Sequence, residues 1–197
     1  MTQIFGNFIE ELPEQEEYLL IGFSPASVSL KERWANNGLS ADFIAEYFKS
    51  FFVNKMGETE EEESIALENL RDAVKYIANE LLENAMKFQD SSVPYTAKIG
   101  FSIYNDRLIF LVSNGINEWQ VEPLQIFVNS LLNEDPSELY FQTMKANAQN
   151  NTNSRLGLLS MVCDYSAKLG WKFEKSKTEP PITIVKTMVC LEIGTIL

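Results

Sequence analysis

The 197-residue sequence contains no histidine. Zinc sites built on imidazole, serine–histidine hydrolysis and a phosphohistidine relay within the chain are therefore excluded. Cysteine is scarce as well, since Cys163 and Cys190 are the two in the chain, and the first residues lack the basic start and apolar core of a signal peptide. We therefore expect a cytoplasmic protein with reduced thiols.

Positive charge and long apolar runs are also in short supply. The 16 Lys and Arg residues against 28 Asp and Glu give a formal net charge of -12, which disfavours binding to nucleic acid or to an anionic membrane. No apolar run approaches the roughly 20 residues that cross a bilayer. Hydrophobic residues nevertheless make up 45% of the chain, which is typical of a globular protein.

The apolar patterns alternate between strand and helix types. Strands are expected at 18–23, 96–104, 108–112, from Trp171 onward and at 182–193. Helices are expected at 26–35, 40–55, 64–89, 121–133, 137–148 and 156–169. In this interpretation Asn36-Asn37-Gly38 separates the first two helices, Asn114-Gly115 closes a strand, and Gly170 caps the last helix.

This order predicts an α+β two-layer sandwich, with a mixed, mostly antiparallel sheet and helices on one face. The length indicates a single domain, 1–197. Its first part, 1–63, supplies a strand and helices, and 64–193 forms the core of a pocket. The polar segment 147–154 is low in complexity, so we expect a mobile lid near 115–153.

The most informative stretch is 80–87, Glu-Leu-Leu-Glu-Asn-Ala-Met-Lys. Glu80, Asn84 and Lys87 follow at steps of four and three residues, so they share one helix face. Mg²⁺ takes oxygen ligands, and general-base chemistry needs a placed carboxylate. The alternative is a solvated helix face, but Asn84 lies beside the apolar stripe, and a buried amide must find partners.

Three segments, in this order, resemble the GHKL superfamily of gyrase, Hsp90, histidine-kinase and MutL ATP-binding domains. The stretch 80–87 resembles its N-box, and Asn114-Gly115 resembles a remnant of its first glycine box. Arg155-Leu156-Gly157-Leu158 resembles a reduced second glycine box before the final helix. The resemblance covers roughly 64–193 and implies the fold and the nucleotide cleft.

The resemblance also implies roles for single residues. Asn84 would hold an Mg²⁺ ion that bridges phosphates, Lys87 would meet a phosphate oxygen, and Glu80 would orient or deprotonate the attacking group. Gly157, just before a helix, would let backbone N–H groups approach an anion. The family's adenine-binding Asp is absent, and the uncharged Asn114 is a weaker acceptor. We therefore expect inefficient ATP turnover.

Two narrower resemblances lead to different functions. The N-terminal segment, the missing His, and Asn129, Leu139 and Tyr140 are similar to SiaB-like bacterial kinases, which implies an ATP- and Mg-dependent Ser/Thr kinase acting on a small partner protein. Other relatives with a degenerate pocket hold a flavin and respond to light. In that interpretation an isoalloxazine ring stacks on aromatic side chains of the lid: Trp119, Phe127, Tyr140 and Phe141.

The leading expectation is a signalling or sensor protein that binds the flavin FAD, with FMN as the alternative flavin, and switches with light or redox state. Cys190 or Cys163 would then tune the flavin, the alternative being an inert buried thiol. The other functions left open are the kinase, with ATP or ADP and Mg, and a ligand-free anti-sigma-like interaction module. A small signalling protein is the expected partner, without nucleic acid or membrane, and a homodimer is left open.

Overall fold

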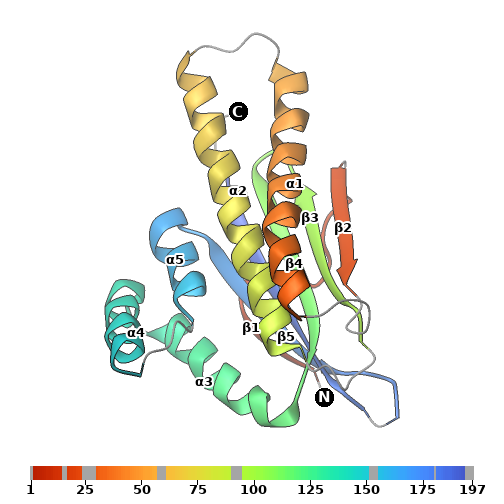
Figure 1. Ribbon diagram of the computed structural model, residues 1–197, viewed down its shortest axis with the longest axis vertical. Coiled ribbons are helices and arrows are strands. Elements are labelled where there is room, and N and C mark those ends of the chain that lie inside the picture. The colour runs from red at the N-terminus through yellow and green to blue at the C-terminus, as the bar shows by residue number, and fades with distance from the viewer. Residues whose placement is uncertain are drawn as a thin grey trace.

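A six-stranded sheet forms one layer of the protein and helices form the other (Figure 1). The computed structural model describes residues 2–14, 17–23, 30–56, 61–89, 95–150, 155–179 and 181–193. Its elements, in chain order, are β1 (Gln3–Gly6), β2 (Glu17–Phe23), α1 (Leu30–Met56), α2 (Glu61–Phe88), β3 (Ala97–Ile103), β4 (Arg107–Ile116), α3 (Glu118–Asn133), α4 (Pro136–Asn150), α5 (Leu156–Tyr165), β5 (Lys168–Lys175) and β6 (Thr183–Glu192).

The sheet has the strand order β1-β5-β6-β4-β3-β2, and every neighbouring pair is antiparallel. Its helix-covered face packs against α1 and α2 in one apolar cluster that also takes in parts of α3 and α5. Val74, Ile77 and Leu81 of α2 are buried in this cluster, as their three- and four-residue spacing predicts. The predicted α+β sandwich with helices on one face is confirmed.

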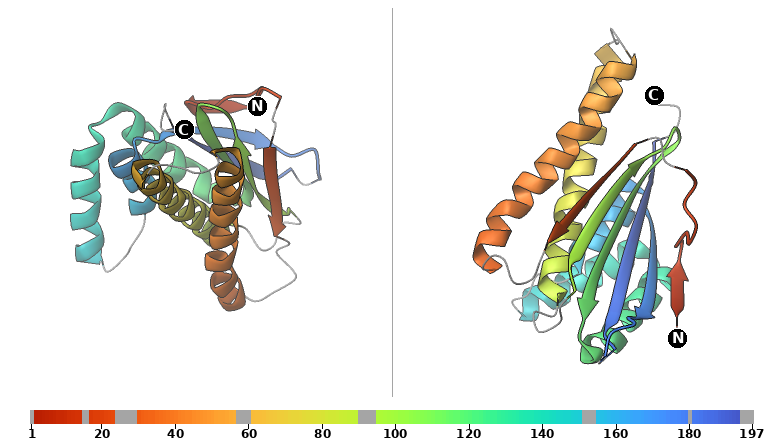
Figure 2. Two further views of the ribbon diagram at one scale, coloured as in Figure 1. Left: turned by 90° about the horizontal axis from the view of Figure 1, so that it is seen from above. Right: turned by 90° about the vertical axis from the view of Figure 1, so that its right-hand side faces the viewer.

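The opposite face of the sheet is partly covered by the chain between β1 and β2 (Figure 2). Phe8, Ile9 and Leu12 from this segment pack on a small apolar cluster of Ile109, Met188 and Cys190. The segment approaches closely because β5 has a glycine there: a Cβ on Gly170 would lie 2.3 Å from the Phe8 nitrogen. Gly170 therefore serves a close backbone contact and does not cap a helix.

Helix α1 is a single helix, so the predicted interruption at Asn36-Asn37-Gly38 is wrong. A glycine inside a helix costs about 1 kcal/mol relative to alanine, too little to break a helix with tertiary support. That support comes from Ile44 and Phe48, which are buried against the sheet, because packing of an amphipathic face provides most helical stability in proteins.

Two further boundaries differ from the sequence prediction. Helix α5 ends at Tyr165 instead of residue 169, because Ser166 adopts a left-handed conformation with φ of 52° and ends the helix. Strand β4 continues through Asn114 and Gly115 to Ile116, since all three pair with β6. Strand β1 was not predicted, because four residues give too short an alternating pattern to recognise.

Two predicted segments lie partly outside the described residues: the start of the helix expected at 26–35 and the end of the polar segment, 151–154. Residues 147–150 of that segment belong to α4. Within the described ranges, no helix is both long enough and apolar enough to cross a membrane.

We expect Phe48→Ala to lower the free energy of unfolding by about 3–5 kcal/mol, because it opens a cavity in the core. Phe48 is fully buried, and its ring centroid lies 4.8 Å from that of Phe52 and 6.4 Å from that of Phe101. Urea denaturation measures the change. Phe141→Ala is the matched control, because Phe141 is 60% exposed on α4, and it should shift stability by less than about 0.5 kcal/mol. Equal effects of the two substitutions would contradict the proposed core.

Candidate functional site

A cleft opens between the C-terminal end of α2, the end of β4, and helices α3 and α5, which lie beside that end of α2 in Figure 1. Its outer cavity has a volume of about 190 Å³. A smaller cavity of about 40 Å³ lies deeper, against the sheet. The two cavities are adjacent, because five residues line both: Asn84, Phe88, Ile116, Leu124 and Leu158.

The walls of this cleft are mainly apolar, and few polar groups face it. Asn84, Gln120 and Arg155 contribute to the outer cavity, while Asn114 and Thr187 contribute to the inner one. An apolar cleft with a few placed polar groups is typical of a small-molecule site. The cleft brings together Asn84, Asn114 and Arg155, which sequence analysis selected from three separate segments.

Asn114 is the most informative of these residues. Its side chain is 4% exposed, and its Nδ2 atom is buried without a hydrogen bond to any residue that the structure describes. Leaving a buried donor unpaired costs about 1–3 kcal/mol. An unpaired amide beside a cavity is the arrangement expected where a ligand supplies the missing acceptor.

Gln89 fixes the end of α2 against β4. Its Oε1 atom accepts a hydrogen bond of 3.2 Å from the Gly115 N–H, and its Nε2 donates to the Tyr95 carbonyl at 3.1 Å. Gly115 is buried, and its hydrogen bond joins the end of β4, which carries Asn114, to the end of α2, which carries Asn84. Sequence analysis did not select Gln89, although it ends the helix expected at 64–89, two residues after the stretch 80–87.

Glu80 and Gly157 are in direct contact. A Cβ on Gly157 would lie 1.8 Å from Oε2 of Glu80, so only glycine lets this carboxylate lie against the first turn of α5. Burial, and secondarily the charge of Glu83, raises the pKa of Glu80. The position where the resemblance implies an approach of backbone N–H groups to an anion is therefore filled by the protein's own carboxylate.

Arg155 joins α3 to α5 at the mouth of the cleft. It adopts a left-handed conformation with φ of 73° immediately before α5, which is unusual for a residue other than glycine. Its guanidinium carbon lies 5.0 Å from the centroid of the Phe127 ring, and its Nη2 donates to the Pro123 carbonyl at 3.4 Å. Leu156 is half-buried at the start of α5 and does not line either cavity.

The aromatic residues predicted to line the cleft are divided between two positions. Trp119 and Phe127 line the outer cavity, and Trp119 is 73% exposed. Tyr140 packs against the main core cluster, and Phe141 is exposed on α4. Neither Tyr140 nor Phe141 lines either cavity.

Lys87 and the two thiols lie apart from the cleft. The Lys87 side chain is exposed, with its ammonium 5.5 Å from the centroid of the Phe88 ring. Cys190 is buried in the small cluster on the opposite face of the sheet, and Cys163 is exposed on α5. Burial is the main cause that raises the pKa of each thiol, which favours the less reactive neutral form.

We expect Glu80→Gln to stabilise the fold near neutral pH. A carboxylate whose pKa is raised in the folded state contributes stability below its unfolded pKa, about 4.3, and loses that contribution as the pH rises through the raised value. Glutamine stays neutral, so the variant should be more stable than the wild type near neutral pH and equally stable at about pH 4.

Urea denaturation across this pH range measures the difference between the two proteins. Glu179→Gln, in the exposed turn between β5 and β6, is the control and should change stability by less than about 0.5 kcal/mol at either pH. A Glu80→Gln protein that is less stable than the wild type near neutral pH would contradict the burial argument.

No family model matches this sequence, and no curated protein matches it. Among solved structures, the chain is similar to one described as the crystal structure of the SiaB-SiaC complex from Pseudomonas aeruginosa. The TM-score is 0.54 at 12% sequence identity, and the match covers 88% of this chain and 89% of that chain. At this identity the likeness is one of fold, and it extends over nearly the whole of both chains.

Proposed function

We propose that this protein is a signalling protein that binds an adenine nucleotide in the cleft and acts on a small protein partner. The observation that carries the proposal is the buried, unpaired Nδ2 of Asn114 beside the inner cavity. A purine ring offers acceptor nitrogens to such a donor. Val112, Ile116 and Leu158 supply apolar walls next to it.

The size of the cleft favours a single heterocycle over a whole dinucleotide. The outer cavity of about 190 Å³ is below the roughly 300–1,000 Å³ that is usual for clefts enclosing drug-sized ligands. A base therefore fills the interior, and the sugar and phosphates extend through the mouth. Arg155 lies at that mouth, and a guanidinium is well suited to bind phosphate oxygens.

A magnesium ion fits this site only if bound phosphates supply most of its ligands. Among the described residues there is no group of three or more Cys, Asp or Glu side chains that could hold a metal ion. Asn84 lines both cavities, so its amide oxygen would be the ligand that this chain contributes. When bound, Mg²⁺ supplies positive charge that neutralises the phosphates.

Transfer of phosphate to a partner is the kinase form of this proposal. Glu80 lies one helical turn before Asn84 and in contact with Gly157, and its raised pKa makes it a stronger base than an ordinary glutamate. The fold likeness to a chain from a two-protein complex and the resemblance to SiaB-like kinases both support a protein partner. The test of this form is transfer of labelled phosphate from ATP to a partner protein. The transfer should be lost in the Asn84→Ala variant.

We expect Asn114→Leu to separate ligand binding from stability. Replacing an amide whose buried nitrogen is unpaired with an apolar side chain of similar shape should leave stability unchanged or raise it by about 1 kcal/mol. The same change should weaken binding of ADP or ATP at least about tenfold, because the donor to the base is lost. Calorimetric titration, with and without Mg²⁺, and urea denaturation measure the two effects.

Asn133→Leu is the matched control, because Asn133 is exposed at the end of α3 and its Nδ2 donates to the Asn129 carbonyl. It should leave nucleotide affinity unchanged. Undiminished binding in Asn114→Leu, or a wild-type protein that binds no adenine nucleotide at about millimolar concentration, would overturn the proposal.

Flavin binding is the second candidate, and the exposed Trp119 at the cavity mouth favours it. A tryptophan that is 73% exposed beside Phe127 offers a stacking surface to an aromatic ring. Under this candidate the purified protein absorbs blue light, and Trp119→Ala releases the flavin. Phe141→Ala, the control on α4, retains it. A colourless protein that does not take up added FMN or FAD would exclude the candidate.

A further inference from the structure

Strand β2 lies at an edge of the sheet and lacks the usual protection of an edge. Within the described residues no strand pairs with its outer side. Its seven-residue pairing with β3 has no bulge, and its sequence, Glu-Tyr-Leu-Leu-Ile-Gly-Phe, contains no lysine or proline. Exposed edges of soluble proteins are normally blunted by such residues or covered.

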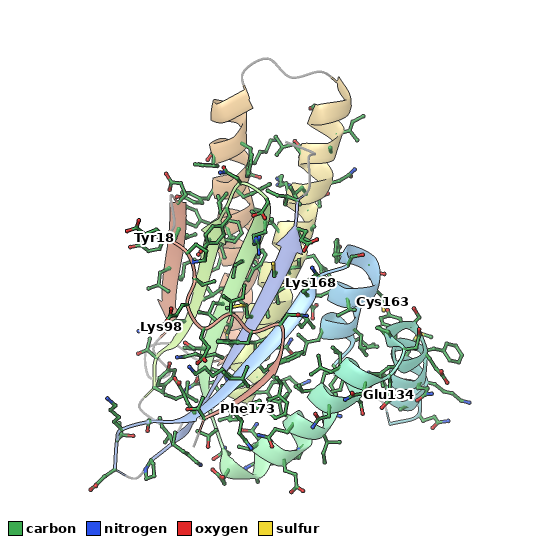
Figure 3. The ribbon with its side chains drawn as sticks, turned by 180° about the vertical axis from the view of Figure 1, so that it is seen from behind. Tyr18, Lys98, Glu134, Cys163, Lys168 and Phe173 are labelled. Atoms are coloured by element: carbon green, nitrogen blue, oxygen red, sulfur yellow. The ribbon has the colours of Figure 1, made fainter. Side chains whose placement is uncertain are left out.

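Apolar side chains add to this edge. Tyr18 and Leu20 point away from the helices and are 64% and 59% exposed; Figure 3 shows Tyr18 projecting from β2 at the margin of the sheet. The single charge of the strand, Glu17, stands at its start and accepts a hydrogen bond of 2.6 Å from the Tyr47 hydroxyl. The middle of β2 is therefore uncharged.

The opposite edge of the sheet is covered. Strand β1 has four residues, and helix α3 packs against it. The side chain of Gln125 on α3 donates a hydrogen bond of 2.7 Å to Gln3 on β1. The β1 edge is short and covered, whereas the β2 edge is longer and open among the described residues. This difference is expected if the β2 edge is an interface.

We infer that two copies of this chain form a dimer by antiparallel pairing of β2 with β2 of the partner, about a two-fold axis at Leu20. This register pairs all seven residues and joins the two sheets into one. On the exposed face it sets Leu20 opposite Leu20 of the partner subunit, and Tyr18 opposite Gly22 of the partner subunit. A tyrosine ring covers a glycine well across strands, and large apolar pairs stabilise a sheet.

The charges near β2 are compatible with a second copy as the occupant of this edge. A chain with a net charge of -12 repels its own copies, so close contact requires a neutral surface. In the proposed register the two Glu17 carboxylates are six residue steps apart, roughly 20 Å, which exceeds the screening length of about 8–10 Å. The two β2 strands therefore add little electrostatic repulsion at the dimer contact.

Helix α1 extends the apolar surface beside the edge. Leu39, Phe43 and Tyr47 follow at four-residue steps and share one stripe of α1, and Tyr47 bonds to Glu17 of β2. Leu39 and Phe43 are 68% and 55% exposed. Stable interfaces bury about 1,200–2,000 Å² in total, more than one strand pair supplies, and this stripe provides the second layer. Because both copies use the same edge and β1 is covered, the assembly closes as a dimer.

Site-directed crosslinking tests the register in the full chain with Cys163→Ser. We expect Leu20→Cys to form a disulfide-linked dimer under mild oxidation, because directly opposed residues have Cα atoms about 4.5–5.5 Å apart, which suits a disulfide. Tyr18→Cys is the control on the same face. Its two copies lie four residue steps apart, about 14 Å, and should not crosslink.

Sedimentation of the uncrosslinked protein tests the dimer itself. Leu20→Lys places two like charges opposite each other and should weaken dimerisation at least about tenfold, with an unchanged circular dichroism spectrum because Leu20 is exposed. Ile126→Lys, at a 60% exposed position on α3, should leave the dimer intact. The inference is overturned by a monomeric wild type at about 100 µM, by a dimer insensitive to Leu20→Lys, or by equal crosslinking of Tyr18→Cys and Leu20→Cys.

Discussion

Burial of one helical stripe on the sheet determines the position of the cleft. Val74, Ile77 and Leu81 of α2 are at most 1% exposed, which fixes both the rotation and the height of the helix on the sheet. Asn84 lies about one turn beyond Leu81 on the same stripe. It lines both cavities, which lie between α2, the end of β4 and α5. Gln89 then ties the end of α2 to Gly115. Asn84 of α2 and Asn114 of β4 are thus held in place by core packing and by this hydrogen bond.

Three features that ordinarily lower stability lie together at and beside the cleft. Asn114 keeps a buried donor unpaired, Glu80 keeps a half-buried carboxylate, and Arg155 holds a left-handed backbone. Each feature lowers stability, since it strains the backbone or leaves polar groups poorly solvated. Their concentration around one cavity is typical of a site where function limits the choice of residue. The main apolar core shows no comparable conflict among the described residues.

Sequence patterns predicted the elements whose signals are local. The long period-3.6 stripe gave α2, and alternation gave the hairpin of β3 and β4. The continuous α1 was missed because Gly38 is a local signal that tertiary packing overrides. The motifs located Asn84, Asn114 and Arg155, but the walls of the cleft come from residues such as Phe88 and Leu124, which look like ordinary core positions until α3 and α5 are in place.

The position of Cys190 shows why a residue selected from the sequence need not lie at the cleft. Side chains along a strand alternate between faces, so Val189 enters the main core while Cys190 points to the opposite face. Which face of the sheet a residue of β6 occupies therefore depends on a single register step between β6 and β4. Sequence alone does not fix that step, because β6 is apolar on both faces: one face packs against the helices and the other against the N-terminal segment. The apolar packing on both faces stabilises β6. It also removes the alternation of polar and apolar residues that would have assigned Cys190 to one face of the sheet.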